Sequence, residues 1–292
     1  MKKLSCVLAF ASLLMMGGPE TSYAQEVASG FNPNSVRPIH DSDILYKKRV
    51  WRRMDLKEKQ NRPFFAYNNE ITKIIIEAVK QGILHPYAND SLKTRMSKEK
   101  FLENLQLPIA GYQSDEPAAT EGDEWGSGAS GWGDEPAKDA KAAGANGAPA
   151  SDGSFFNNQV SVLEIMEDMI FDKKRSRLYF DIQSVKLVLP PDLFPETGLL
   201  REVGVFRYKD LVELFKSMPQ EAIWYNPQNQ AAHRSLADAF ELRLFNARIV
   251  KIGNPRDEFL VDIYNQSPKD GIMASMRMEQ ELMEMEHNLW EF

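Results

Sequence analysis

Apolar residues recur at two different spacings along the chain, and each spacing predicts a different kind of element. Over residues 71–82 the spacing is helical, and it places on one face Ile71, Ile75, Ala78 and Val79. Asn68 and Asn69 are the expected cap of this helix, and Gly82 is its expected end. A second helix is expected to begin at Ser97.

The second half of the chain changes to the alternation typical of strands. Strand-like residues begin at Val160, and two alternating sets follow, namely Leu178, Phe180 and Ile182, then Val185, Leu187 and Leu189. The phase slips by one between the sets, which predicts a bulge at residues 183–184. The prolines at 190–191 end the strand. Residues 247–265 indicate a hairpin that turns at residues 253–255.

Three more helices are expected over residues 208–216, residues 231–246, and from residue 267 nearly to residue 292. The predicted fold class is therefore α+β, with mixed helices and short antiparallel strands or hairpins. The last helix is rich in methionine, and its candidate contact residues are Met276, Met283 and Trp290. Two interpretations stay open: it closes the core of its own domain, or it offers an adaptable surface to a partner protein.

A shift in composition divides the chain. Residues 114–154 consist largely of Gly, Ala, Ser, Pro, Asp and Glu, which predicts a disordered acidic linker. Trp125 and Trp132 lie in it, either by drift or as short docking motifs for a partner. The expected organisation is a signal peptide (1–24), an extended arm (25–45), an N-terminal helical part (46–113), the linker (114–154) and a C-terminal α+β part (155–292).

The first residues predict export. Lys2 and Lys3 precede a short apolar run, and small residues before Gln25 predict cleavage after Ala24. The only cysteine, Cys6, lies before the apolar run rather than after it, so a lipid attachment site is not expected. These features predict an exported mature protein without a lipid anchor.

Charge and motifs exclude several classes of function. The net charge of −7 is concentrated between Asp115 and Asp152, so the remaining parts are close to neutral and no nucleic-acid binding is expected. The chain lacks the sequence motifs of serine hydrolases, zinc proteases, phosphate-binding loops and dinucleotide-binding folds. We therefore expect no enzymatic activity, no catalytic residues, no metal and no cofactor.

A basic and aromatic stretch from Tyr46 to Phe65 is the strongest candidate binding segment. It carries eight basic and two acidic residues, and its candidate contact residues are Tyr46, Arg49, Trp51, Arg52, Arg53, Phe64 and Phe65. Arginine pairs with carboxylates through two hydrogen bonds, and tryptophan is a common anchor at interfaces. A protein interface and a solvated helix face beside a core tryptophan both stay open.

Three blocks of sequence resemble the GldN/PorN family, and the resemblance implies a source among Porphyromonas-type Bacteroidetes. They are HDSDILYKKRVWRRMDLKEKQNRPFF from His40, EDMIFDKKRSRL from Glu167, and WYNPQNQAAHRSLADAFELRLFNARIVK from Trp224. The resemblance covers nearly the whole mature chain outside residues 114–154.

The resemblance implies a non-enzymatic periplasmic component of the type IX protein secretion system, which also serves gliding motility. Its implied partners are a PorK/GldK-like lipoprotein, further copies of itself in a ring, and a PorM/GldM-like inner-membrane motor protein. The outer membrane would be reached only through the lipoprotein. An exported carbohydrate- or peptidoglycan-binding module is the alternative, and it would act as a monomer.

Overall fold

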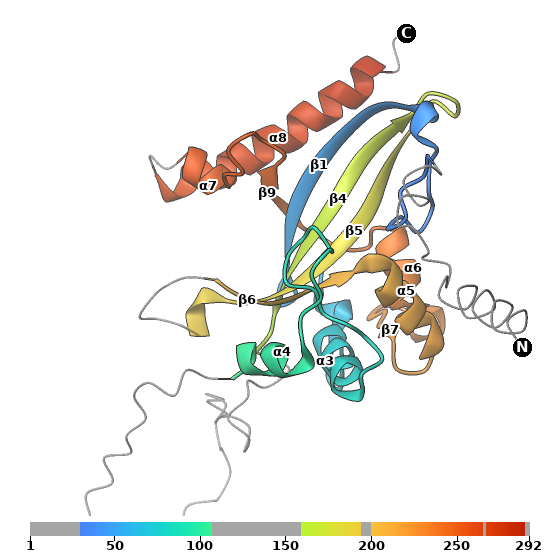
Figure 1. The fold of residues 1–292 in the computed structure, drawn as a ribbon, viewed down its shortest axis with the longest axis vertical. Helices are drawn as coiled ribbons and strands as arrows, with labels where there is room; N and C mark the ends of the chain where they lie inside the picture. Colours follow the sequence, from blue (N-terminus) through green and yellow to red (C-terminus); the bar gives the residue numbers. More distant parts are fainter. Residues whose placement is uncertain (1–29, 107–158, 194–199, 265–266, 290–292) are drawn as a thin grey trace, which may run out of the picture.

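A five-stranded antiparallel sheet organises the chain (Figure 1). The computed structural model describes residues 30–106, 159–193, 200–264 and 267–289. In spatial order the strands are β6 (Arg201–Arg207), β5 (Arg177–Leu189), β4 (Val162–Asp172), β1 (Ile44–Asp55) and β9 (Arg248–Ile252). The predicted α+β class is confirmed. The expected signal peptide and linker lie outside the described residues.

Strand β1 is the main difference from the sequence prediction, which expected the part from residue 46 to be helical. β1 lies inside the sheet, between β4 and β9. Its register with β4 runs from Ile44 opposite Asp172 to Asp55 opposite Val162. Buried residues do not simply alternate along it, because Val50 and Trp51 are consecutive and both buried. The sequence of β1 therefore does not show the alternation of apolar and polar residues by which a strand is usually predicted.

The hairpin of β4 and β5 confirms the predicted strand and its bulge. Met166 pairs with Ser184 and Glu167 pairs with Ile182, so Gln183 is the extra residue on β5. β5 ends at Leu189, directly before the two prolines, and the 3-10 turn η3 (Pro191–Leu193) follows. β6 pairs only with residues 184–189 of β5.

The helices are short except for the last one. Their bounds are α3 (Ile71–Gln81), α4 (Lys98–Asn104), α5 (Tyr208–Ser217), α6 (Leu236–Glu241), α7 (Leu260–Ile263) and α8 (Pro268–Leu289). Gly82 ends α3 with φ 77°, a left-handed conformation that suits glycine, and the Ser97 side chain caps α4, as predicted. The expected cap of α3 is wrong: Glu70 occupies that position without a side-chain bond.

Two other predicted elements differ from the structure. The hairpin expected over residues 247–265 has only its first strand, β9, because the chain continues into the short helix α7. The helix expected over residues 231–246 is reduced to α6. The residues before α6 instead form the 3-10 turn η4 (Gln230–Ala232) and β8 (Arg234–Ser235), which pairs with β7 (Ile223–Trp224).

Of the remaining small elements, η1 (Asp41–Asp43) lies directly before β1, where the Asp43 carbonyl accepts a hydrogen bond from Lys173 in the turn between β4 and β5. The others complete the lower end of the molecule, and they are η2 (Arg62–Phe64), β2 (Phe65–Ala66) and β3 (Asn69–Glu70). The larger apolar core gathers here, where α3, α5 and α6 surround the lower ends of the strands (Figure 1). Phe240 of α6 lies at its centre, with ring centroids at 5.2 Å from Phe64 and 6.0 Å from Tyr208.

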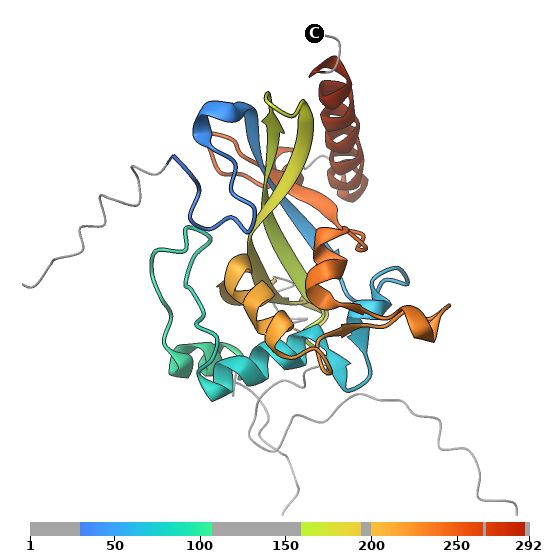
Figure 2. The same cartoon turned by 90° about the vertical axis from the view of Figure 1, so that its right-hand side faces the viewer.

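Helix α8 packs on the other end of the sheet, apart from these helices (Figure 2). A second, smaller apolar cluster holds it there, and its buried members are Val50, Met169, Ile249, Ile252, Leu260, Ala274 and Leu282. α8 extends to Leu289, close to its predicted end. Within the described ranges, no helix has the length and apolar content that a membrane span requires.

Candidate functional site

Strand β4 carries four acidic side chains into the interior of the sheet. Glu164 is 5% exposed, and Glu167, Asp168 and Asp172 are fully buried. Buried carboxylates are costly unless they are paired and hydrogen-bonded. The antiparallel register places the basic residues of β1 beside them. Four of the eight basic residues of the stretch form ion pairs with these carboxylates, namely Lys47, Arg49, Arg52 and Arg53.

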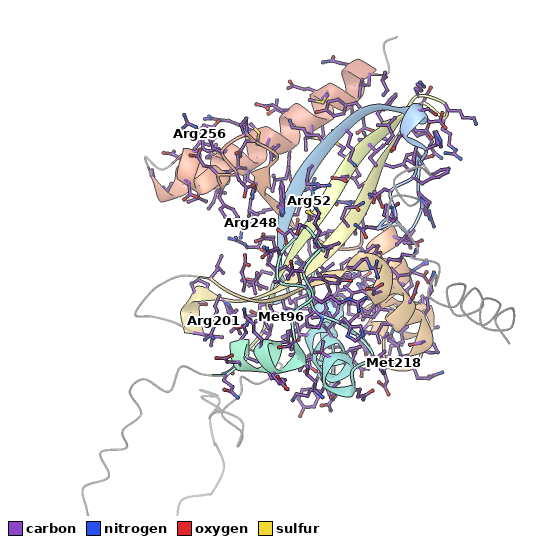
Figure 3. All side chains as sticks on the ribbon, viewed as in Figure 1. Arg52, Met96, Arg201, Met218, Arg248 and Arg256 are labelled. Carbon is purple, nitrogen blue, oxygen red and sulfur yellow. The ribbon has the colours of Figure 1, made fainter. Side chains whose placement is uncertain are left out.

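Glu167 joins three parts of the molecule. Arg52 of β1 donates to it at 2.6 Å, and Arg243, after α6, donates at 2.7 Å. Arg52 also donates to Glu279 of α8 at 2.9 Å and to the Ala247 carbonyl at 3.3 Å. Figure 3 shows Arg52 over the middle of the sheet. This network links the sheet to both α8 and the segment after α6.

Asp168 and Glu164 lie on the opposite face of the sheet. Arg49 donates to Asp168 at 2.7 Å, and Lys47 lies at 3.0 Å. Burial alone would raise the pKa of Asp168, but the hydrogen bonds and charges of these two residues outweigh it and hold the pKa below its ordinary value. Glu164 is paired with Arg53 at 3.3 Å.

Lys186 of β5 is the cation with the most partners on this face. Its ammonium lies 2.8 Å from Glu202, 3.3 Å from Asp90 and 3.4 Å from Glu164. Burial acts to lower the pKa of Lys186, and the surrounding carboxylates more than reverse this, so its pKa is raised. The lysine is therefore a fixed structural cation.

The residues predicted from the basic and aromatic stretch are mostly internal. Trp51 is 8% exposed, its indole N–H donates to Asp90 at 3.1 Å, and the Lys251 ammonium lies 4.4 Å from its ring centroid. Phe64 is fully buried, and Tyr46 and Phe65 are partly buried. The stretch therefore contributes mainly to the sheet and the core. Its exposed residues are Lys47 and Arg49 at its start, and Lys57, Lys59, Gln60 and Arg62 after β1.

Met276 and Met283 of α8, by contrast, are 58% and 63% exposed. Other exposed apolar residues accompany them on α7 and α8, and we define the α7–α8 surface by Val261, Ile263, Ile272, Met273, Met276 and Met283. Methionine is unbranched and polarizable, which suits surfaces that repack around a partner. Trp125, Trp132 and Trp290 lie outside the described residues.

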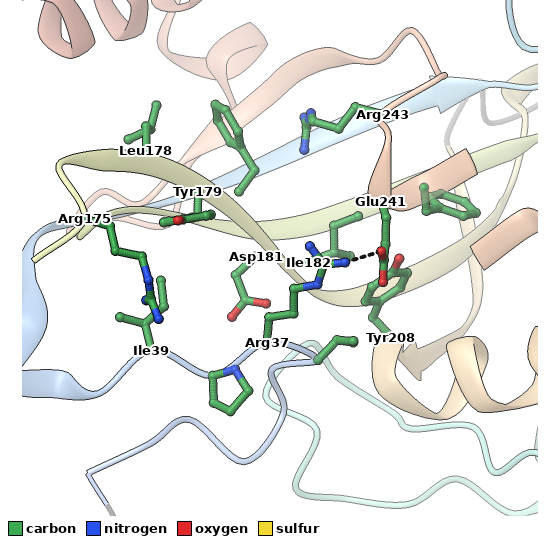
Figure 4. Close-up of a pocket in the computed structure, with 14 residues that line it drawn as sticks. Arg37, Ile39, Arg175, Leu178, Tyr179, Asp181, Ile182, Tyr208, Glu241 and Arg243 are labelled. Carbon is green, nitrogen blue, oxygen red and sulfur yellow. Dashed lines mark hydrogen bonds and ion pairs between the residues drawn. The ribbon is translucent and has the colours of Figure 1, made fainter. Parts of the chain in front are cut away.

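A cavity of about 540 Å³ opens beside β5 (Figure 4). One wall is the segment Val36–Ile39, and the other is the upper half of β5. Val36–Ile39 is part of the extended arm predicted over residues 25–45, and from here on the name arm refers to Val36–Ile39 alone. Tyr208, Phe240, Glu241 and Arg243 complete its lining near α5 and α6. Its volume lies within the roughly 300–1,000 Å³ range of ligand pockets.

Two polar groups in this cavity are incompletely paired among the described residues: Asp181 has a hydrogen bond but no ion pair, and the Tyr208 hydroxyl has no hydrogen bond. Burial raises the pKa of Asp181 to about 6, and the Gln183 side chain donates to it at 2.6 Å. The Tyr208 hydroxyl is buried without a hydrogen-bond partner among the described residues, and burial raises its pKa. Arg37 and Glu241, by contrast, form a closed ion pair at 2.6 Å.

The lining of the cavity is mainly apolar and aromatic, with a few charged side chains. No serine, cysteine or histidine is among the described lining residues, so none of these usual nucleophiles or bases accompanies Asp181. Across the described ranges, no group of three or more acidic, histidine or cysteine side chains is placed to hold a metal ion. The sequence reasoning missed this site, because Asp181 is one charged residue in an otherwise ordinary strand, and Tyr208 and Glu241 come from helices 20 or more positions away. The only sign of this site in the sequence was the change in alternation at residues 183–184, which marks the bulge beside it.

Comparison with known proteins gives the chain its family. No curated protein sequence matches it. The family model described as "Gliding motility associated protein GldN" matches residues 39–291, a range that includes all five strands of the sheet, the cavity except for the first part of the arm, and α8. Because the match covers most of the sequence, the chain belongs to the GldN family of gliding-motility-associated proteins.

Proposed function

We propose that the protein is a non-enzymatic periplasmic subunit of the type IX secretion system. In this proposal it assembles with a PorK/GldK-like lipoprotein into a ring under the outer membrane, and the ring contacts a PorM/GldM-like motor protein. Membership of the GldN family supports the link to gliding motility and type IX secretion. The export signal expected in residues 1–24 supports the compartment.

The exposed α7–α8 surface is the observation that carries this proposal. One side of α8 buries Ala274 and Leu282 against the sheet, while Met276 and Met283 face outward. A helix that packs one apolar side on its own domain and exposes another apolar side is suited to bind a partner protein. A closed ring needs two different contact surfaces on each subunit. We assign the α7–α8 surface to one of these contacts.

The second contact is assigned to the exposed start of the basic and aromatic stretch. Leu45 is 59% exposed, and the side chains of Lys47 and Arg49 are 40% and 44% exposed while paired with Asp168. Arg52 and Arg53 are more buried, at 12% and 28%, so they act in this contact only through the sheet that they stabilise. This narrows the candidate lipoprotein contact to residues 45–49.

The test is to purify residues 25–292 with and without the lipoprotein and to measure mass by light scattering. A large complex that forms only with the lipoprotein is expected. Met276→Glu with Met283→Glu should reduce the amount of complex, whereas Ile83→Glu, an equally exposed apolar site at 59% beyond α3, should not. A persistent monomer that binds peptidoglycan fragments would contradict the proposal and favour a glycan-binding module.

A further inference from the structure

The upper half of β5 has a strand on only one side. β4 pairs with β5 from Arg177 onward, but the ladder with β6 begins only at Ser184. Among the described residues, the arm makes no backbone hydrogen bond to residues 177–183. This segment, which we call the open edge, therefore presents backbone donors and acceptors without a neighbouring strand. Such an edge is a template for pairing with another chain.

The cavity follows this open edge. Five consecutive residues line it, from Leu178 to Ile182. Successive side chains of a strand point to opposite faces, so a cavity that touches five in a row lies along the edge of the strand rather than over one face. Figure 4 shows the arm passing alongside β5 with Asp181 between them. The space therefore has the position that an added strand would take.

The charges of the lining indicate what such a strand carries. The three lining arginines are already paired: Arg37 with Glu241, Arg175 with Asp172, and Arg243 with Glu167. Asp181 is the lining carboxylate without an ion pair among the described residues. A cation on an incoming segment would pair with it, and the Tyr208 hydroxyl, whose residue is 4% exposed, offers a further unused hydrogen bond.

We propose that the open edge binds an extended segment of another protein by strand addition, with a lysine or arginine of that segment beside Asp181. Asp181 lies on one face of β5, and Leu178, Phe180 and Ile182 lie on the other. The residues of the bound segment on either side of its lysine or arginine face these three apolar side chains, so they are apolar as well. The inference goes beyond the proposed function, because it holds whether or not the protein forms a ring.

The experiment uses the mature chain and a fluorescent nine-residue peptide as the probe. Threonine and valine alternate in the peptide, and a central lysine replaces the middle threonine, so that lysine and valine lie on opposite faces. We expect binding by fluorescence anisotropy and slowed amide hydrogen exchange over residues 177–183. Replacing the lysine by glutamate, or Asp181 by Asn, should weaken binding about tenfold, as expected for one charge-assisted hydrogen bond.

Matched controls separate strand addition from other modes of binding. Asp192→Asn, at an exposed position in η3, should leave the affinity unchanged. A peptide methylated on alternate amide nitrogens should lose binding, because it cannot donate to the edge. Equal binding of the methylated peptide, equal affinity of Asp181→Asn, or no binding of any peptide would each overturn the proposal. A dimer of the protein alone that protects residues 177–183 would also overturn it, because a second copy would then fill the edge.

Discussion

Glu167 shows at the scale of one residue how the protein tolerates charge in its interior. It is fully buried and accepts hydrogen bonds from Arg52 and Arg243, whose guanidinium lies 4.5 Å from the Phe180 ring centroid. A buried ion pair is weak evidence for net stability, because removing two charges from water is expensive. Removing only one partner of a buried ion pair destabilises the protein strongly, since the other charge then stays buried without its partner.

The first prediction follows from this asymmetry. Arg52→Met keeps most of the side-chain volume but leaves Glu167 with Arg243 alone, so we expect the free energy of unfolding to fall by about 2–4 kcal/mol. Urea unfolding measures it. The control is Arg256→Met, because the Arg256 side chain is 82% exposed and lies 3.9 Å from its partner, the Glu258 carboxylate. Figure 3 shows Arg256 near α7. Equal stability of the two variants would refute the structural role of Arg52.

Asp181 leads to a prediction about pH. Its pKa is raised to about 6 from an ordinary 3.8, so the folded state binds a proton that the unfolded state releases between these two values. The stability of the wild-type protein contributed by this group therefore falls as pH rises from 4 to 7. Lys47 favours the charged form and Asp168 opposes it, while burial is the largest cause.

Asp181→Asn removes a partly buried negative charge without changing the shape of the side chain. We expect the variant to be more stable than the wild type by about 1–2 kcal/mol at pH 8 and to match it near pH 4. Urea unfolding at the two pH values, with Asp192→Asn as the exposed control, tests this. A difference that is the same at both pH values would contradict the assigned titration.

At the scale of elements, α8 has one side packed on the sheet, as the core interpretation expects, and an exposed side that we propose for a partner. Leu282 is 5% exposed in the smaller apolar cluster, while its neighbour Met283 is 63% exposed. We expect Leu282→Glu to lower the midpoint of thermal unfolding by several degrees, since it buries a charge. Met283→Glu should leave the midpoint unchanged and reduce the amount of the large complex that forms when the lipoprotein is present.

Equal midpoints for the two variants would show that α8 does not pack on the sheet as described. A loss of stability in Met283→Glu would instead assign its outward side to the core of the protein. Circular dichroism recorded during heating distinguishes these outcomes with the protein alone, before any partner is added.

The sequence predicted elements well where the signals were local. Gly82, the cap at Ser97, the bulge before Ser184 and the prolines after β5 all act on their own neighbours along the chain. β1 was missed because its determinants are distant: Arg49 pairs with a carboxylate 119 residues later, and Arg52 with one 115 residues later. Before those partners are known, its basic residues have the pattern of a solvated surface.

The same reasoning explains why the candidate site was only partly predicted. Met276 and Met283, which the methionine-rich composition of the last helix singled out, are exposed on α8, and their contact with a partner stays a prediction. The cavity combines the arm, β5 and two helices, and its position depends on β6 starting late along β5. That register is a property of the assembled sheet, and no short motif records it.

At the scale of the whole molecule, the central sheet joins the parts of the chain that lie on either side of residues 107–158. β1 comes from the first part, and its two neighbours, β4 and β9, come from the second. Residues 44–55 face residues 162–172 along the full length of β4. The two parts are therefore held together by backbone pairing and ion pairs as well as by the covalent chain.

This arrangement predicts the behaviour of a cut chain. A specific protease site placed after Gly131 should allow cleavage without separation, because the ladder between β1 and β4 survives. The two fragments should elute together in gel filtration under native conditions and separate only in denaturant. Elution of two separate folded fragments would contradict a shared sheet.

The position of β1 also determines the order in which the molecule can fold. An exported chain enters its compartment with the amino terminus first, so β1 arrives before β4 and β9 are there to pair with it. Contacts between such distant segments make folding slow, and an unpaired strand is exposed to aggregation meanwhile. The clustered lysines and arginines of β1, which later neutralise the carboxylates of β4, repel other copies of the nascent strand during that delay.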